Sequence, residues 1–227
     1  MKTPCSILLF FCLTTAAFSQ AFYNTAAFKG AASFMPAPVP DIFMQDFESG
    51  TIPSGWTTSA GSPNYGYTPA LSGNYSLNCS NASSVYTILS PTRSELYFFA
   101  QIKLDTLTAG GFIILNPNSC FEMYILATGA MRVFDMGFAH QATTVSTMAT
   151  NQLYYIWMHY KAGSGANATC TFAFNTSLSE PTSGNNFASV PTANSTNLIN
   201  FTTIYSTGGN TIIDHIGSAT FDMPNGW

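Results

Sequence analysis

The chain has 227 residues, of which 46% are hydrophobic, 15% are aromatic and only 7% are charged, and its formal net charge is −4. Soluble domains usually contain about 25% charged residues, so the surface of this protein must be rich in hydroxyl and amide groups. Nucleic-acid-binding proteins need clustered cations. The basic residues here are scattered, among them Arg93, Lys103, Arg132 and Lys161, so this class of protein is excluded.

The first nineteen residues predict a secretory signal peptide. Lys2 precedes an apolar run over residues 7–13, and small side chains lead up to Ser19, which is the order that such peptides follow. The run is too short to span a bilayer, since a membrane helix needs about 20 apolar residues. We therefore expect a secreted, extracellular protein with no membrane span, whose mature chain begins at Gln20.

Residues 20–40 predict an arm or linker ahead of the folded domain. Pro36, Pro38 and Pro40 alternate with other residues at its end, and this spacing favours an extended polyproline conformation over a central strand. The folded domain is expected over residues 41–227.

Period-two patterns dominate the rest of the chain. The clearest strand covers residues 95–105, with Phe98, Ala100 and Ile102 on one face and Tyr97, Phe99 and Gln101 on the other. Further strands are predicted over residues 112–115, 121–127, 131–136, 142–148, 153–161, 169–175, 198–205 and 211–215. Residues 179–197 are predicted to form a long loop. No segment keeps a helical period, so the predicted fold is all-β, a two-sheet antiparallel jelly-roll sandwich.

Several motifs resemble one known family. Residues 46–50 (DFESG) and 52–56 (IPSGW), the run 154–160 (YYIWMHY) and the closing residues 212–216 (IIDHI) resemble concanavalin A-like, laminin-G-like sandwich domains of exported bacterial proteins. The resemblance spans about residues 42–222 and implies two stacked sheets, one of them concave. It implies no activity, because this fold hosts lectins, glycosidases, lyases and adhesion modules.

The resemblance also implies a possible cofactor, a structural calcium ion. In similar sandwiches the first and last strands are neighbours and carboxylates there often hold Ca²⁺, which would assign Asp46, Glu48 and Asp214 as metal ligands. Calcium takes six to eight oxygen ligands, and His215, a poor ligand, stands where the family has a second closing acid. The alternative is that these acids cap turns and face water.

A sugar-binding face is the main functional prediction. Carbohydrate sites combine flat aromatic rings with amide and hydroxyl groups. Two predicted strands offer such side chains, and the candidate residues are Tyr97, Phe99, Gln101, Tyr155, Trp157 and His159. The alternative is that these aromatics belong to the core. If they bind sugar, replacing Trp157 with alanine should abolish retention on polysaccharide and leave the far-ultraviolet spectrum unchanged.

Catalytic signatures are weaker. The paired carboxylates of glycosidases on this fold are absent. Fragments at residues 93–96, 101–102 and 160–163 resemble alginate-lyase motifs, but their spacing is wrong. The predicted function is a secreted, non-catalytic, lectin-like module whose partner is a polysaccharide or glycan. The alternatives are a structural or adhesive surface protein and an alginate-lyase-like polysaccharide lyase.

Three cysteines follow the predicted signal peptide, namely Cys79, Cys120 and Cys170. An odd number in an oxidising compartment allows one disulfide with a spare thiol. It equally allows three buried thiols, because an unpaired cysteine behaves as a small hydrophobic residue.

Overall fold

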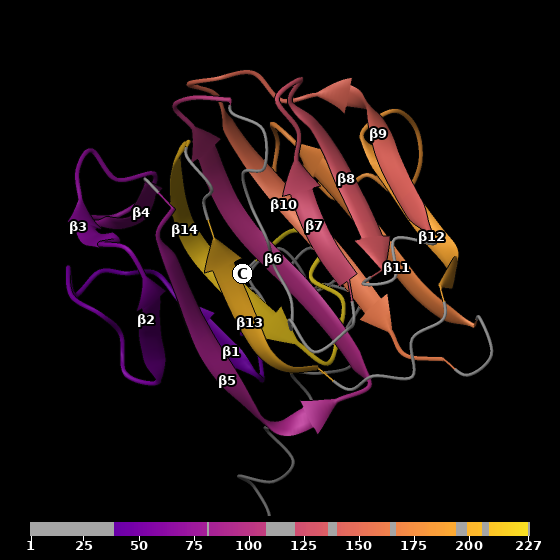
Figure 1. Cartoon of the computed structure of the whole chain (residues 1–227), viewed down its shortest axis with the longest axis horizontal. Coiled ribbons are helices and arrows are strands. Elements are labelled where there is room, and N and C mark those ends of the chain that lie inside the picture. The colour runs from indigo at the N-terminus through magenta and orange to yellow at the C-terminus, as the bar shows by residue number, and fades with distance from the viewer. Residues whose placement is uncertain are drawn as a thin grey trace, which may run out of the picture. The chain divides into compact units, whose positions relative to one another are not determined.

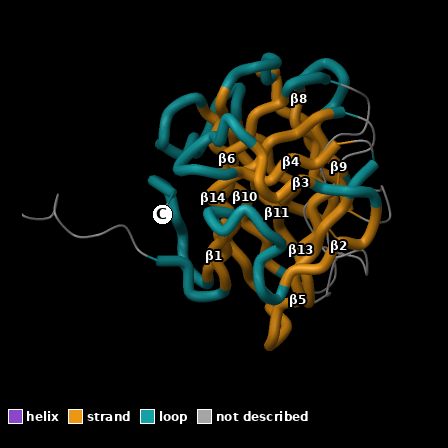
Figure 2. Tube along the Cα trace, turned by 90° about the vertical axis from the view of Figure 1, so that its left-hand side faces the viewer, coloured by secondary structure: helices purple, strands orange, loops and turns teal. Residues whose placement is uncertain are grey.

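The computed structural model describes residues 39–80, 82–107, 121–135, 140–163, 167–193, 199–205 and 209–226. The chain divides into two compact units, Met1–Ala37 and Pro38–Trp227. The first unit, with the predicted signal peptide and most of the predicted arm, lies outside the described residues. Within the described ranges, no helix has the length and hydrophobicity that crossing a membrane requires. Strands and loops make up the described part, as Figure 2 shows.

One layer of the second unit is a large antiparallel sheet. Its strands run in the order β12-β11-β10-β6-β14-β4-β3, and β1 also pairs with β14. Their bounds are β1 (Phe43–Gln45), β3 (Asn64–Tyr67), β4 (Ser76–Ser80), β6 (Glu95–Leu104), β10 (Leu153–Lys161), β11 (Ala168–Asn175), β12 (Phe187–Ala193) and β14 (Asn210–Ala219). The last strand therefore lies beside the first one and near the middle of the sheet.

The opposing layer consists of two smaller sheets rather than one. The first has the order β13-β5-β2 and the second β7-β8-β9. Their bounds are β2 (Trp56–Ala60), β5 (Ser84–Arg93), β7 (Phe121–Ile125), β8 (Ala130–Asp135), β9 (Gln141–Thr147) and β13 (Ile199–Tyr205). Figure 1 shows β7, β8 and β9 in front of β10, β11 and β12. The predicted all-β, antiparallel sandwich is confirmed, with its second layer divided between these two sheets.

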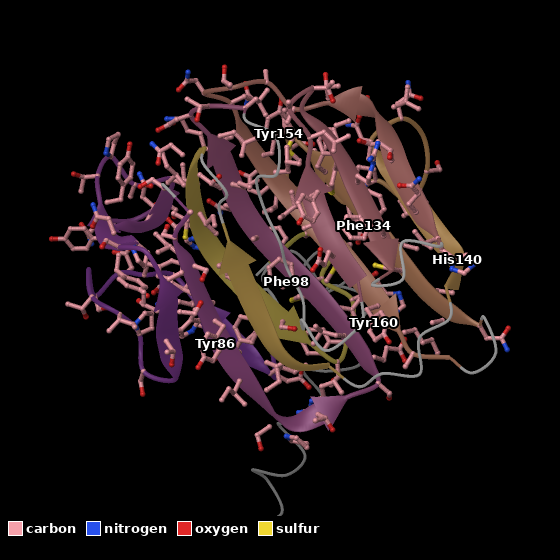
Figure 3. All side chains as sticks on the ribbon, viewed as in Figure 1. Tyr86, Phe98, Phe134, His140, Tyr154 and Tyr160 are labelled. Atoms are coloured by element: carbon pink, nitrogen blue, oxygen red, sulfur yellow. The ribbon has the colours of Figure 1, made fainter. Side chains whose placement is uncertain are left out.

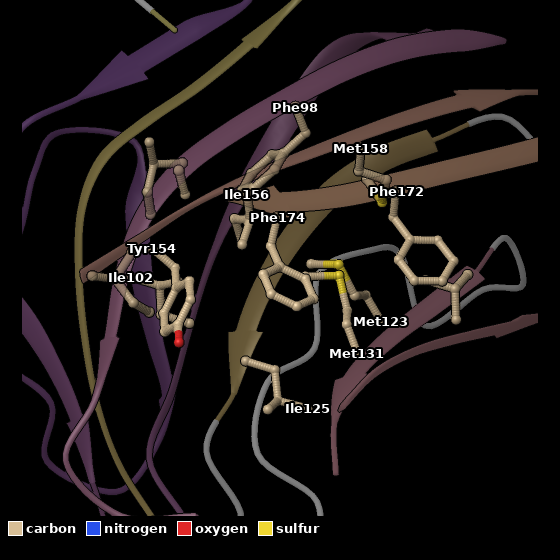
Figure 4. Packing of buried hydrophobic residues seen from close by; sticks show 14 of the residues in the cluster. Phe98, Ile102, Met123, Ile125, Met131, Tyr154, Ile156, Met158, Phe172 and Phe174 are labelled. Atoms are coloured by element: carbon tan, nitrogen blue, oxygen red, sulfur yellow. The ribbon is translucent and has the colours of Figure 1, made fainter. Parts of the chain in front are cut away.

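The main core fills the space between the two layers. The large sheet contributes alternate residues such as Phe98, Ile156 and Phe174. They pack in one cluster with Met123 of β7 and Met131 of β8 (Figure 4). All five side chains are at most 2% exposed. Burying one side chain of this size stabilises the fold by about 1.5 to 3 kcal/mol, so this cluster fixes which face of β6 and β10 points inward.

The predicted loop over residues 179–197 is wrong in part, because it contains the strand β12. Among the described strands it pairs with β11 alone and so forms one edge of the large sheet. An edge strand needs hydrogen bonds on one side only and tolerates Pro191. The prediction also omits β2 to β5, whose sequences are rich in hydroxyl residues. The predicted strand over residues 112–115 lies outside the described residues.

The two described cysteines are both buried. Cys79 has a free thiol, and its burial raises the pKa of that thiol to about 12. Because the thiolate is the reactive form, Cys79 acts here as a small apolar side chain. Cys170 lies in the main core, and Cys120 is outside the described residues.

Candidate functional site

The six predicted sugar-binding residues share one face of two neighbouring strands. Strands β6 and β10 pair antiparallel, which sets Tyr97 opposite His159, Phe99 opposite Trp157, and Gln101 opposite Tyr155. The residues between them on both strands belong to the main core. Because successive side chains of a strand alternate between faces, the six lie on the side of the large sheet that faces away from the core. We call this side the outer face.

The aromatic rings form a continuous row on the outer face. The rings of Tyr97 and His159 stack with their centroids 4.0 Å apart and their planes within 5°. Phe99 lies 5.6 Å from Trp157 and 6.2 Å from Tyr155, again between ring centroids. Tyr97, His159, Tyr155 and Gln101 are each partly exposed.

The carboxylate of Glu95 holds one end of this row through two contacts. Nε2 of His159 lies 2.9 Å from a carboxylate oxygen of Glu95, and Nζ of Lys161 lies 3.4 Å from the other oxygen. The hydrogen bond with His159, followed by contributions from Lys161, lowers the pKa of Glu95 below its usual value. Glu95 therefore stays ionised and orients the imidazole ring against Tyr97.

The middle of the row is covered by the end of the chain. Phe99 and Trp157 are 1% and 2% exposed, and they form a second small cluster with Ala219 and Met223. The indole Nε1 of Trp157 donates a hydrogen bond of 2.9 Å to the carbonyl of Met223. Both rings are shielded from solvent, because this apolar C-terminal segment packs on them. Their part in ligand binding stays a prediction.

A pair of carboxyl groups beside the row was not predicted from the sequence. The side chains of Glu180 and Asp222 share a hydrogen bond, and burial together with the Asp222 charge raises the pKa of Glu180 to about 7. Burial raises the pKa of Tyr97, and the charges of Glu95, Asp222 and Glu180 raise it further. Two carboxyl groups hydrogen-bond only when one keeps its proton, so this pair shares one proton and presents its remaining oxygens as acceptors.

No local sequence pattern predicts this carboxyl pair, because the two residues are far apart in the chain. Glu180 follows β11 and Asp222 follows β14. The available signal is that Asp222 stands between two apolar residues, Phe221 and Met223, in a chain with only ten acidic residues. The backbone N–H of Glu180 also donates to the carbonyl of Pro224 at 2.9 Å, so backbone pairing fixes the two segments together.

The alginate-lyase-like fragments contribute side chains to both faces of the large sheet. Tyr160 is fully buried and packs in the main core with Phe98 (Figure 3). Lys161, the next residue, points to the outer face, where its side chain is 58% exposed. The strand alternation therefore places these two side chains on opposite sides of the large sheet, and a single substrate could not contact both.

The predicted calcium ligands already have protein donors. Asp214 is fully buried and accepts hydrogen bonds from Ser72 and Ser76 at 3.1 and 2.9 Å. Glu48 accepts bonds from the backbone and side chain of Asn74. Among the described residues, no three acidic, histidine or cysteine side chains are grouped as metal ligands would be. Since calcium needs several free oxygen ligands, these residues do not fit a calcium ion.

We expect calcium to leave the thermal stability of this protein unchanged. After treatment with a chelator, adding Ca²⁺ to about 5 mM should shift the melting temperature by less than about 1 °C, because a ligand stabilises a fold only when it binds the folded state. The measurement is differential scanning calorimetry with and without the ion. A clear upward shift would show that calcium binds the folded protein, and would restore Asp46, Glu48 and Asp214 as candidate ligands.

Comparisons with known proteins show the fold. No protein-family model and no curated protein matches the chain. The metal-free exoplasmic/lumenal domain of VIP36 is 8% identical with a TM-score of 0.53, over 81% of this chain and 93% of that one. The alginate lyase Aly36B, a double mutant solved with an alginate tetrasaccharide, is 10% identical with a TM-score of 0.50, over 82% and 99%.

A third similar structure is a much longer protein. A GH43 glycoside hydrolase engineered for endo-xylanase and exo-arabinofuranosidase activity is 13% identical with a TM-score of 0.50. The match covers 82% of this chain, which spans only 42% of the hydrolase. Identities this low show a shared β-sandwich fold and leave the activity open, because one fold hosts many functions.

Proposed function

We propose that this protein is a secreted, non-catalytic module of concanavalin A-like type that binds a glycan on the outer face of β6 and β10. The observation that carries the proposal is the stacked Tyr97–His159 pair, held by Glu95 and bordered by the row of further aromatic rings. Aromatic rings provide apolar surface for the C–H faces of a sugar. Secretion through the signal peptide over residues 1–19 is part of this proposal.

The polar groups around the stacked pair suit the hydroxyl groups of a sugar. Gln101 brings an amide and Tyr155 a phenol, each partly exposed at the other end of the row. The Glu180–Asp222 pair adds carboxyl oxygens that can accept hydrogen bonds from sugar hydroxyls, because its one O–H is used within the pair. Sugar hydroxyls both donate and accept, so this mixture matches them.

The charges beside Tyr97 favour a neutral glycan over a polyuronate. The charges of Glu95, Asp222 and Glu180 raise the pKa of Tyr97, and the Glu180–Asp222 pair keeps one negative charge even while it shares a proton. Lys161 is the cation that contacts Glu95 on this face, and it is already engaged there. An anionic polymer would be repelled by this arrangement, since like charges in an interface cost affinity. This argues against the alginate-lyase-like alternative for this face.

Removing the Tyr97 ring is expected to weaken glycan binding by about tenfold or more, as the loss of a central aromatic contact does. Tyr97→Ala and His159→Ala of the full chain would be compared with wild type by affinity electrophoresis in gels containing mannan, laminarin or arabinoxylan. The matched control is Tyr75→Ala, which removes a 37% exposed ring in the loop between β3 and β4 and not on β6 or β10.

The proposal fails if wild-type protein migrates unretarded in every gel, or if Tyr97→Ala is retarded as strongly as wild type. Concentration-dependent self-assembly without any retardation would instead support the structural or adhesive alternative. The structural or adhesive role does not depend on the aromatic residues of the outer face.

A further inference from the structure

The C-terminal residues Phe221–Gly226 lie over the centre of the proposed binding face, and we call them the strap. Thr220, just before the strap, is anchored by hydrogen bonds of 2.7 and 2.6 Å to the carboxylate of Asp41. Past this anchor, Met223 packs with Phe99 and Trp157 in the small outer cluster, and the partly buried Phe221 packs against the same cluster. Gly226 is buried close to the Phe99 ring.

Few polar contacts hold the strap closed among the described residues. They are the Trp157 indole bond to Met223, the Glu180 backbone bond to Pro224 and the carboxyl–carboxyl bond between Glu180 and Asp222. The cluster beneath it is separate from the main core. A terminal segment held by one small cluster and few polar contacts opens at a lower free-energy cost than the whole fold.

We propose that the strap is a gate, which closes over Phe99 and Trp157 and opens to add these two rings to the proposed glycan-binding face, with the Glu180–Asp222 pair as its latch. The opening itself rests only on the contacts of the strap. Its role in admitting a ligand rests on the proposed function.

The latch joins two elements through one shared proton. Glu180 lies in the loop after β11 and Asp222 lies in the strap, so their hydrogen bond ties the strap to the sheet. The other ionisable groups that face this corner are Tyr97 and Glu95 of β6. His159 and Lys161 of β10 pair with Glu95. When the shared proton leaves, Glu180 and Asp222 become like charges in contact and repel each other.

The direction of the pH effect follows from the raised pKa of Glu180. In the closed state this pKa is about 7, against an ordinary value of 4.5 when the latch is open. The closed state therefore binds the proton more tightly than the open state. The resulting stabilisation of the closed strap is complete below about pH 4.5 and is lost as the pH rises through about 7. Because Glu180 keeps some solvent contact, screening reduces the size of the effect.

The indole N–H of Trp157 reports on the strap directly, because it is bonded to Met223 only when the strap is closed. Hydrogen exchange of this proton would be measured by NMR on the full chain labelled with ¹⁵N-tryptophan, with Trp157→Phe used for assignment. After correction for base catalysis, we expect its protection to fall by about tenfold between about pH 5.5 and about pH 8. The Trp56 indole, in the main core, should show no parallel change.

Two variants test the latch. In Glu180→Gln the amide N–H replaces the shared proton at every pH, so the protection of Trp157 should become independent of pH. The control is Glu122→Gln, since Glu122 also has a pKa raised by burial but lies on β7 in the other layer. This control should behave as wild type does.

Equal protection of Trp157 at both pH values in wild type would overturn the gate, and so would a Glu180→Gln variant that keeps the wild-type pH dependence. A parallel loss of protection at Trp56 would also overturn it, by showing that the whole fold loosens. Since no glycan is present, these results are independent of whether the proposed function holds.

Discussion

Replacing Trp157 with alanine is expected to lower the free energy of unfolding by about 3 to 5 kcal/mol, the usual cost of removing a buried tryptophan. Trp157 is 2% exposed, packs with Phe99 and Met223, and donates a hydrogen bond to the strap. The alanine variant loses this packing and the indole hydrogen bond, and the Met223 carbonyl keeps only the Gly226 backbone N–H as a donor. Urea denaturation of the full chain measures the difference.

Trp157→Phe is the matched variant, because it keeps an aromatic ring and removes the indole N–H. It should cost far less than alanine. A loss below about 1 kcal/mol for Trp157→Ala would show that the strap does not pack on this ring in solution. The far-ultraviolet spectrum alone cannot distinguish these outcomes, because a fold with about 5 to 15 kcal/mol of stability keeps its strands after such a loss.

The second large effect is expected at Asp214, which lies in β14 beneath the loop before β4. Replacing it with alanine should lower the free energy of unfolding by about 3 kcal/mol, because buried donors then lose their acceptor. Those donors are the backbone N–H of Ser72 and the hydroxyl of Ser76. His215 contributes its own backbone N–H at 2.9 Å. Thermal and urea denaturation measure the loss.

Glu48→Ala serves as the control for Asp214, since Glu48 belongs to the same predicted calcium set but accepts its hydrogen bonds at an exposed position. Its replacement should shift the denaturation midpoint much less. If the two variants were equally destabilised, and only when calcium is present, the acids would act as metal ligands after all. Equal and small effects without calcium would instead mean that the buried hydrogen bonds of Asp214 do not form.

The alternation of inward and outward residues along β6 and along β10 made the site partly predictable from the sequence. Apolar residues at every second position assign the inward face of each strand without any structure, and this assignment is correct for Phe98 and Ile156. The sequence alone does not give the register between the two strands, so the stacking of Tyr97 on His159 could not be derived. That stack depends on long-range pairing.

The cover over Phe99 and Trp157 was not predictable for a related reason. Phe221 and Met223 follow the last strand without any periodic pattern, and which surface they pack on depends on where β14 ends within the sheet. The Glu180–Asp222 contact has the same origin. The strand β12 was missed because edge strands tolerate polar residues and proline, so its composition resembles that of a loop.

The most direct test of the central claim is a glycan array probed with the full wild-type chain at about pH 8, where the latch is expected to be ionised. The account predicts saturable binding to neutral glycans and none to polyuronates such as alginate and polygalacturonate. A blank array from folded protein would contradict glycan binding. Preferential binding to polyuronates would contradict the assignment of this acidic, aromatic face as the binding site.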